Sequence, residues 1–161
     1  MRRFFFLGLA LALGACSTAR PPFSNQYAAG YGVSEAVSCV PYARGQSGIP
    51  IRGDAYTWWS QAVGRYARGN IPHEGAVYVL AKTPRLTRGH LSVVTRVLDP
   101  RTIEVTHSNW GSDRATRSVI YERMRVEDIS PANDWTLARF WNYEANSYGR
   151  PYEAYGFIYP R

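Results

Sequence analysis

The sequence predicts an α+β domain, in which helical segments come first and a run of short antiparallel strands follows. Three observations indicate this class: apolar residues spaced by three and four after residue 53, alternating apolar segments after residue 75, and turn residues between those segments. The chain has 161 residues. We expect residues 34–161 to form one domain, because this length supports one hydrophobic core but not two.

The N-terminus has the pattern of a secretory signal, with two arginines, an apolar run over residues 4–13 and then small residues. The run is shorter than the roughly 18 apolar residues that a membrane-spanning helix needs. Leu-Gly-Ala-Cys at 13–16 resembles the bacterial lipobox, so we expect residues 1–15 to be removed and Cys16 to carry a lipid anchor. Residues 16–33 are small, polar and rich in Pro and Gly, which predicts a flexible tether. Ser17 favours sorting to the outer membrane, so we expect a lipid-anchored protein on its periplasmic face.

The formal net charge is +7, and removal of Arg2 and Arg3 with the signal leaves about +5. Lys82 is the only lysine among 19 basic residues, and the arginines are scattered along the chain. Scattered charge argues against nucleic-acid binding and favours an anionic environment such as an envelope surface or wall polymer. An arginine excess is also what a GC-rich genome produces, so charge alone decides little.

Two helices are expected before the strands. Residues 39–48 predict the first, with Pro41 in its opening turn and glycine at its end, so that Cys39 lies at the helix N-terminus. Residues 53–69 predict the second, with Asp54 as the N-cap. Its apolar residues form one helical face: Ala55, Trp58, Trp59, Ala62, Val63 and Tyr66.

The strands are predicted from β-branched and aromatic segments at residues 75–82, 90–98, 102–110, 117–123 and 155–160. Asp99-Pro100-Arg101 is a turn that joins the second and third of them in a hairpin. Alternation along the third places Ile103, Val105, His107 and Asn109 on one face. Since the hairpin pairs the start of one strand with the end of the other, we expect His90 and Asn109 to lie close together.

Cys39 is the residue that most needs an explanation. If Cys16 is acylated, Cys39 is a lone thiol in an oxidising compartment, where nucleophilic catalysis is one reason to keep it. A helix N-terminus favours the thiolate, a neighbouring imidazole supplies proton transfer, and a third polar group orients that imidazole. Cys39, His90 and Asn109 each lie at the end of a predicted element. The alternative is an inert buried cysteine, since this residue type is often buried.

At these positions the sequence resembles the CHAP family, the cysteine, histidine-dependent amidohydrolases/peptidases, which are similar to papain and NlpC/P60 enzymes in fold. The resemblance covers about residues 34–110. It depends on the following residues: Ser38-Cys39 with Tyr42, Gly53-Asp54-Ala55 to Trp58, Pro72, Gly75-Ala76-Val77, Gly89-His90 and His107-Ser108-Asn109-Trp110.

The resemblance implies a papain-like fold with N-terminal helices packed on an antiparallel sheet or half-barrel. It also implies that Cys39 is the nucleophile, His90 the base and Asn109 the orienting residue. The implied substrate is peptidoglycan, cut through a thioester either by an N-acetylmuramoyl-L-alanine amidase or by a stem-peptide endopeptidase. His107 stands where some members have glutamate, so either it shares the orienting role or Asn109 suffices.

Two other functions remain open from the sequence: a non-catalytic envelope lipoprotein that binds wall peptides, and a transamidase that passes the same thioester to an amine. We expect no cofactor and no metal, because the three histidines lack HxxH or HxH spacing with a carboxylate. Without repeats or heptads, a monomer is expected.

Overall fold

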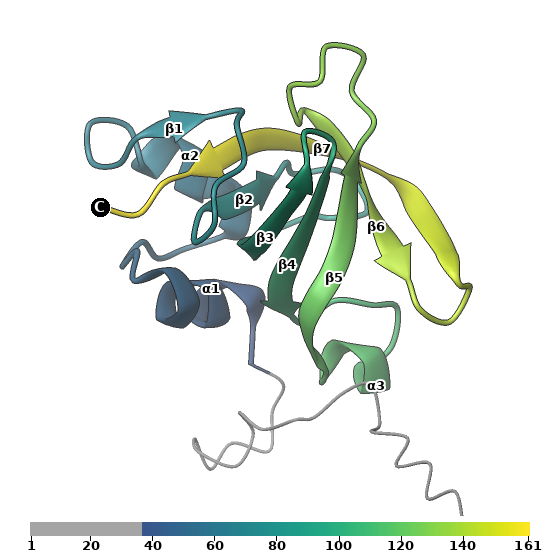
Figure 1. Cartoon of the computed structure of the whole chain (residues 1–161). Helices are drawn as coiled ribbons and strands as arrows, with labels where there is room; N and C mark the ends of the chain where they lie inside the picture. The colour runs from purple at the N-terminus through teal and green to yellow at the C-terminus, as the bar shows by residue number, and fades with distance from the viewer. Residues whose placement is uncertain (1–36) are drawn as a thin grey trace, which may run out of the picture.

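The computed structural model describes residues 37–161, so the predicted signal at 1–15 and the predicted tether at 16–33, with Cys16, lie outside the described residues. This part of the chain is mostly β, with a few short helical segments (Figure 1). The helical segments are α1 Cys39–Ser47, η1 Ala55–Thr57, α2 Trp58–Gln61 and α3 Arg114–Arg117. The strands are β1 Arg68–Gly69, β2 Val77–Leu80, β3 His90–Asp99, β4 Thr102–Ser108, β5 Ile120–Asp128, β6 Leu137–Asn142 and β7 Ser147–Ile158. No helix within 37–161 is long and apolar enough to span a membrane.

The first predicted helix is confirmed as α1, which begins at Cys39. It ends because Gly48 adopts a left-handed backbone with φ of 72°, and its N–H donates to the carbonyl of Arg44 at 3.0 Å. Glycine takes this conformation without the steric cost that a Cβ imposes. The residues buried by α1 are Cys39, Tyr42 and Ala43.

The second predicted helix is wrong in its length. Only a 3-10 turn, η1, and one helical turn, α2, form, and the helix ends at Gln61. Gly64 then adopts φ of +69°, which a right-handed helix does not allow. Residues 68–69 pair with the end of β7 instead, so a strand contact replaces the last predicted turns of the helix.

The predicted half-barrel is also corrected, because the sheet closes. The strand order is β1-β7-β2-β3-β4-β5-β6, and β7 pairs with β6 as well. Residues in the first half of β7 pair with β6, and residues from 154 onward pair with β2. One long strand therefore joins the two sides of the sheet, as its curved path across Figure 1 shows. Closure removes the exposed edges that an open sheet would leave.

The predicted strands at 75–82, 90–98 and 102–110 correspond to β2, β3 and β4, and the hairpin at 99–101 is present. The last two predicted strands are longer than expected, since β5 continues to Asp128 and β7 begins at Ser147. The strand β6 was not predicted. Its burial alternates strictly only for part of its length, and it is held by pairing with β5 and β7.

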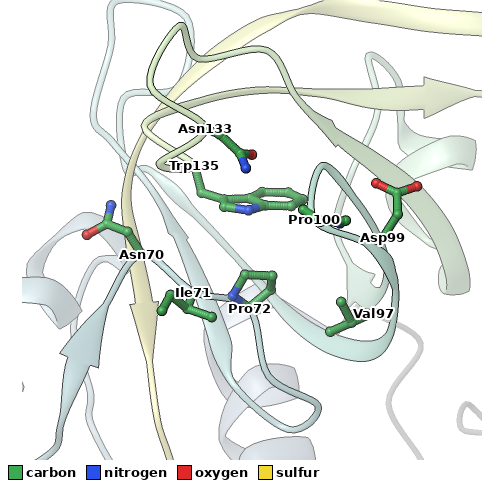
Figure 2. A pocket seen from close by; sticks show the side chains of 8 residues that line it. All are labelled: Asn70, Ile71, Pro72, Val97, Asp99, Pro100, Asn133 and Trp135. Carbon is green, nitrogen blue, oxygen red and sulfur yellow. The ribbon is translucent and has the colours of Figure 1, made fainter.

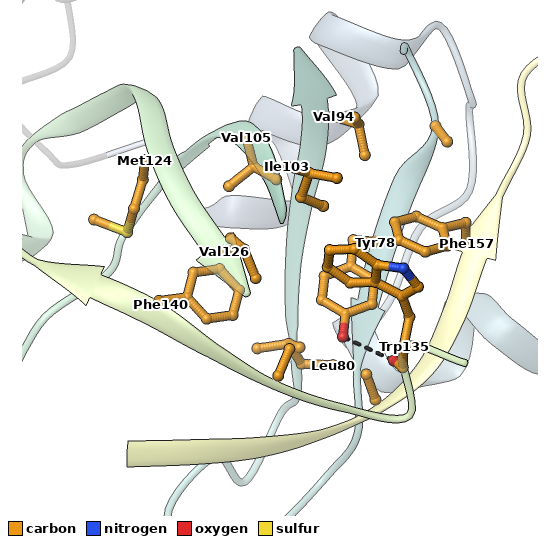
Figure 3. Close-up of a cluster of buried hydrophobic side chains, with 13 residues drawn as sticks. Tyr78, Leu80, Val94, Ile103, Val105, Met124, Val126, Trp135, Phe140 and Phe157 are labelled. Carbon is orange, nitrogen blue, oxygen red and sulfur yellow. Dashed lines mark hydrogen bonds between the residues drawn. The ribbon is translucent and has the colours of Figure 1, made fainter. Parts of the chain in front are cut away.

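Two hydrophobic clusters lie on opposite faces of the strands. The inner cluster fills the barrel, where Tyr78, Trp135 and Phe157 pack together and the Tyr78 hydroxyl donates to the Trp135 carbonyl at 2.8 Å (Figure 3). The outer cluster lies between the helices and the outer side of β2 and β3, and it contains Cys39 and Leu91. The period of two along β3 thus sends His90 inward and Leu91 outward.

Candidate active site

Cys39 lies at the first position of α1, where backbone N–H groups have no intrahelical acceptor. Pro41 has no N–H, and the N–H of Tyr42 donates to the Ser38 carbonyl at 3.1 Å. The N–H groups of Cys39 and Val40 remain, and both are directed at the Cys39 thiol. Two backbone N–H groups that have no acceptor within the helix therefore lie beside the Cys39 sulfur.

The thiol is nevertheless not a preformed thiolate. Burial raises the pKa of Cys39, and hydrogen bonds from the N–H groups of Leu91, Val40 and Cys39 and from the Ser38 side chain only partly oppose it. The expectation that the helix N-terminus would favour ionisation is therefore corrected. Only 7% of Cys39 is exposed, and the loss of hydration outweighs the local dipoles.

Two hydrogen bonds hold the start of α1 against β4. The Ser108 hydroxyl donates to the carbonyl of Val37 at 2.6 Å, just before the nucleophile position. One turn further along, the hydroxyls of Tyr42 and Thr106 are 2.6 Å apart. Because Thr106 and Ser108 flank His107 in sequence, these bonds set the position of Cys39 relative to that strand.

Gly89 brings His90 into place at the start of β3. It has φ of +66°, and a Cβ at this position would lie 2.7 Å from the Leu80 carbonyl oxygen and 2.7 Å from the Tyr56 nitrogen. No L side chain fits in that space. His90 follows directly and pairs with Leu80, while the N–H of the next residue, Leu91, donates to the Cys39 thiol. The thiol therefore contacts the backbone of the residue that follows His90 in β3.

His90 is hydrogen-bonded to His107, with Nε2 of the first 2.9 Å from Nδ1 of the second. Both side chains point into the barrel, and they are diagonal neighbours on β3 and β4. Since Nε2 of His90 is used in this bond, Nδ1 is the ring nitrogen of His90 that this bond leaves free. The sequence placed His107 on the same face as Asn109, and the structure brings His107 into contact with His90.

Asn109 lies outside this pair. The β3–β4 register, extended by three residues from the Val93–Thr106 pair, would put Asn109 directly opposite His90, as predicted. However, β4 ends at Ser108, and Asn109 turns away with φ of 55°. Within residues 37–161 no hydrogen bond joins Asn109 to either imidazole. Its predicted orienting contact is therefore absent from this part of the chain.

Both imidazoles are enclosed by apolar groups. Trp110 covers the pair, with ring centroids 4.6 Å from His90 and 5.4 Å from His107. Tyr121 and Phe140 close the other sides of His107, and its Nε2 lies 3.2 Å from the sulfur of Met124. Burial lowers the pKa of His90 to about 3. Burial, and then the charge of His90, lower the pKa of His107 well below its usual range. The resting site therefore holds a neutral thiol and two neutral imidazoles.

No group of three His, Cys, Asp or Glu side chains within 37–161 is arranged to hold a metal ion. A cleft of about 450 Å³ does exist, but it lies at the other end of β3, between residues 70–72, the β3–β4 hairpin and residues 133–135 (Figure 2). Trp135, which lines it, is only 1% exposed, so the ring offers almost no surface to a ligand. The candidate site is the Cys39, His90 and His107 group.

The model of the CHAP domain matches residues 26–109, about half of the chain. The chain belongs to the CHAP domain family. CHAP domains are typically hydrolases and are associated with the cell wall, so membership supports an enzymatic, wall-related role. A comparison with curated proteins found no match.

The matched residues of this CHAP domain include Cys39, His90, His107 and Asn109. Met124 lies beyond them, and sequence reasoning missed it. Nothing local distinguishes it, because it follows the predicted strand at 117–123 as one more apolar residue. The contact between its sulfur and His107 arises from the pairing of β4 with β5, in which Val105 faces Met124.

Proposed function

We propose that this protein is a cysteine amidohydrolase or peptidase that cuts peptidoglycan amide bonds through a thioester on Cys39. The observation that supports it is the thiol at a helix N-terminus, bonded by the N–H of Leu91, the residue that follows His90 in β3, together with the hydrogen bond between His90 and His107. Nucleophile, base and orienting group are the three parts that such catalysis needs. Family membership supports peptidoglycan as the substrate.

The chemistry follows from the neutral resting state. As the sulfur of Cys39 bonds to the substrate carbonyl carbon, the thiol proton moves to Nδ1 of His90. The N–H groups of Cys39 and Val40 stabilise the oxygen that becomes negative, and loss of one such donor typically costs about 10²- to 10³-fold in rate. The C–N bond then breaks, and His90 gives its proton to the leaving nitrogen.

Water resolves the thioester in the second half of the reaction. It loses a proton to His90 and bonds to the carbonyl carbon, the C–S bond breaks, and the sulfur takes the proton back. The product is a carboxylic acid, and the enzyme returns to its neutral thiol and imidazole. Transfer to an amine in place of water would give an amide of different mass.

Digestion of purified peptidoglycan by wild type, Cys39→Ala and His90→Ala, followed by mass spectrometry, tests the proposal. We expect wild type to release fragments that gain the mass of one water, and both variants to release none. Fragments with a new amide would indicate a transamidase. Binding of wall material without any wild-type cleavage would indicate the non-catalytic alternative.

The orienting role is assigned to His107, since it is the residue bonded to His90. We expect His107→Ala to lower kcat at least about tenfold, equivalent to roughly 1.4 kcal/mol in the transition state, because His90 loses its side-chain hydrogen-bond partner. Asn109→Ala is expected to cost less. If His107→Ala leaves kcat unchanged and Asn109→Ala lowers it strongly, the orienting role belongs to Asn109.

The lipid anchor on Cys16 is also a proposal. Together with the secretory pattern of residues 1–15, it would hold the enzyme at the periplasmic face of the outer membrane, next to the wall.

A further inference from the structure

The ring nitrogen of His107 that is not bonded to His90, Nε2, faces a sulfur atom. It lies 3.2 Å from Sδ of Met124, and both residues are buried, with exposed fractions of 0% and 2%. The rest of the ring is bounded by the aromatic side chains of Trp110, Tyr121 and Phe140. Among residues 37–161, Met124 is therefore the only side chain that hydrogen-bonds to this nitrogen.

A thioether sulfur carries no hydrogen, so it can accept a hydrogen bond but cannot donate one. A neutral imidazole carries its single proton on either Nδ1 or Nε2. With the proton on Nε2, His107 donates to the sulfur. With the proton on Nδ1, the lone pairs of Nε2 and sulfur face each other in an apolar enclosure. The first arrangement is favoured, because it forms a weak hydrogen bond where the second has a repulsive contact.

The tautomer of His107 determines the tautomer of His90. If Nε2 of His107 holds the proton, its Nδ1 can only accept, so the group 2.9 Å away must be a donor, Nε2–H of His90. Nδ1 of His90 then has a free lone pair. In the reverse arrangement His90 would hold its proton on Nδ1 and could not take one from Cys39.

We propose that Met124 is a positioning residue whose sulfur holds the two imidazoles in the tautomer that leaves Nδ1 of His90 free to act as a base. The catalytic consequence rests on the proposed function, whereas the tautomers are a property of the resting protein. When His90 takes the thiol proton it becomes imidazolium and still donates from Nε2 to His107. No proton leaves His107, so the sulfur contact persists through the cycle.

The tautomers are measured directly by long-range ¹H–¹⁵N correlation on the ¹⁵N-labelled full chain at neutral pH. We expect both His90 and His107 to carry the proton on Nε2. A wild-type spectrum with the His107 proton on Nδ1 would overturn the proposal, and this result needs neither a variant nor an activity assay.

Variants test the consequence. Met124→Leu keeps a similar volume but removes the acceptor, so a fraction of His107 should move to the Nδ1–H form, and kcat should fall about three- to tenfold with little change in KM. Met124→Gln places an amide oxygen in reach and should restore both the tautomer and most of kcat. Unchanged tautomers and kcat in Met124→Leu would overturn the proposal.

Val126→Ala is the matched control, since Val126 is a fully buried residue two positions further along β5 in the same cluster. It should lower stability without changing the tautomers or the pH dependence of kcat. Failure of the hydrolase proposal is seen separately, as wall cleavage that survives Cys39→Ala. The NMR measurement of the tautomers in the resting protein tests the role of Met124 independently of that result.

Discussion

At the scale of the residue, Cys39 shows how burial can outweigh a favourable helix position. Two backbone N–H groups of α1, the N–H of Leu91 and the Ser38 side chain all point at the thiol, and each lowers its pKa. Loss of hydration raises it by more. In the proposed mechanism the thiol therefore becomes a nucleophile only as His90 removes its proton during attack.

This balance predicts slow alkylation of the resting enzyme. In a Cys16→Ser background, which leaves Cys39 as the only thiol, the rate of iodoacetamide labelling should rise with a midpoint above that of an ordinary cysteine, because burial raises the pKa of the Cys39 thiol. The unfolded chain in urea, as a control, should label with a midpoint near about 8.5. A folded-state midpoint below about pH 8 would instead show a preformed thiolate and imidazolium pair.

Among the strands, β3 depends on one glycine, Gly89, for the position of its first residue. Gly89→Ala would place a Cβ 2.7 Å from the Leu80 oxygen and at a φ of +66°. We expect a loss of roughly 1–3 kcal/mol in the free energy of unfolding and a large fall in kcat, because His90 must shift with the backbone.

Gly45→Ala is the matched control for that substitution. Gly45 lies inside α1, and a Cβ there would have nothing within 4 Å. The change should stabilise the protein by about 0.5–1 kcal/mol, because alanine is the better helix former. Urea unfolding of both variants checks the pair. Equal effects of the two substitutions would mean that the close approach at Gly89 does not hold the strand.

At the scale of the whole molecule, the buried imidazoles couple stability to pH. Burial lowers the pKa of His90 to about 3 and the pKa of His107 well below 6.5, so the unfolded chain binds protons first as the pH falls. Their contribution to stability is thus fully present above about pH 6.5 and is lost progressively toward acid, by up to about 1.4 kcal/mol per pH unit for each imidazole.

Urea unfolding between about pH 7 and pH 5 measures this loss, because carboxylates with their ordinary pKa near 4 titrate mostly below that range. We expect the free energy of unfolding to fall by roughly 2–4 kcal/mol across it. His107→Gln removes one of the two groups and should reduce the slope by about half. A flat profile for wild type would contradict the neutral state of the pair.

We expect the location of the whole molecule to depend on the proposed lipid anchor at Cys16. Cys16→Ser should release the protein from the membrane fraction or block its processing, since about 0.8 kcal/mol per buried CH₂ of the acyl chains is lost. Fractionation followed by immunoblotting checks this, with Cys39→Ser as the control that should stay in the membrane fraction. A Cys16→Ser protein that fractionates like wild type would rule out the anchor.

The features that could be predicted from the amino-acid sequence are those that neighbouring residues encode. The spacing around Cys39 predicted α1, and the β-branched segments at residues 90–98 and 102–110 predicted β3 and β4 with the hairpin between them. These signals are local, because helix caps, turns and the period of two are set within a few residues.

The hydrogen-bond partner of His90 could not be predicted from the sequence, because tertiary packing sets it. The end of β4 at Ser108 turns Asn109 away, and a diagonal contact brings in His107, with Met124 behind it from β5. The closure of the barrel by β7 and the raised pKa of the Cys39 thiol likewise depend on segments far apart in the chain. Strand register and desolvation are properties of what packs around a residue, and no short stretch of sequence contains that information.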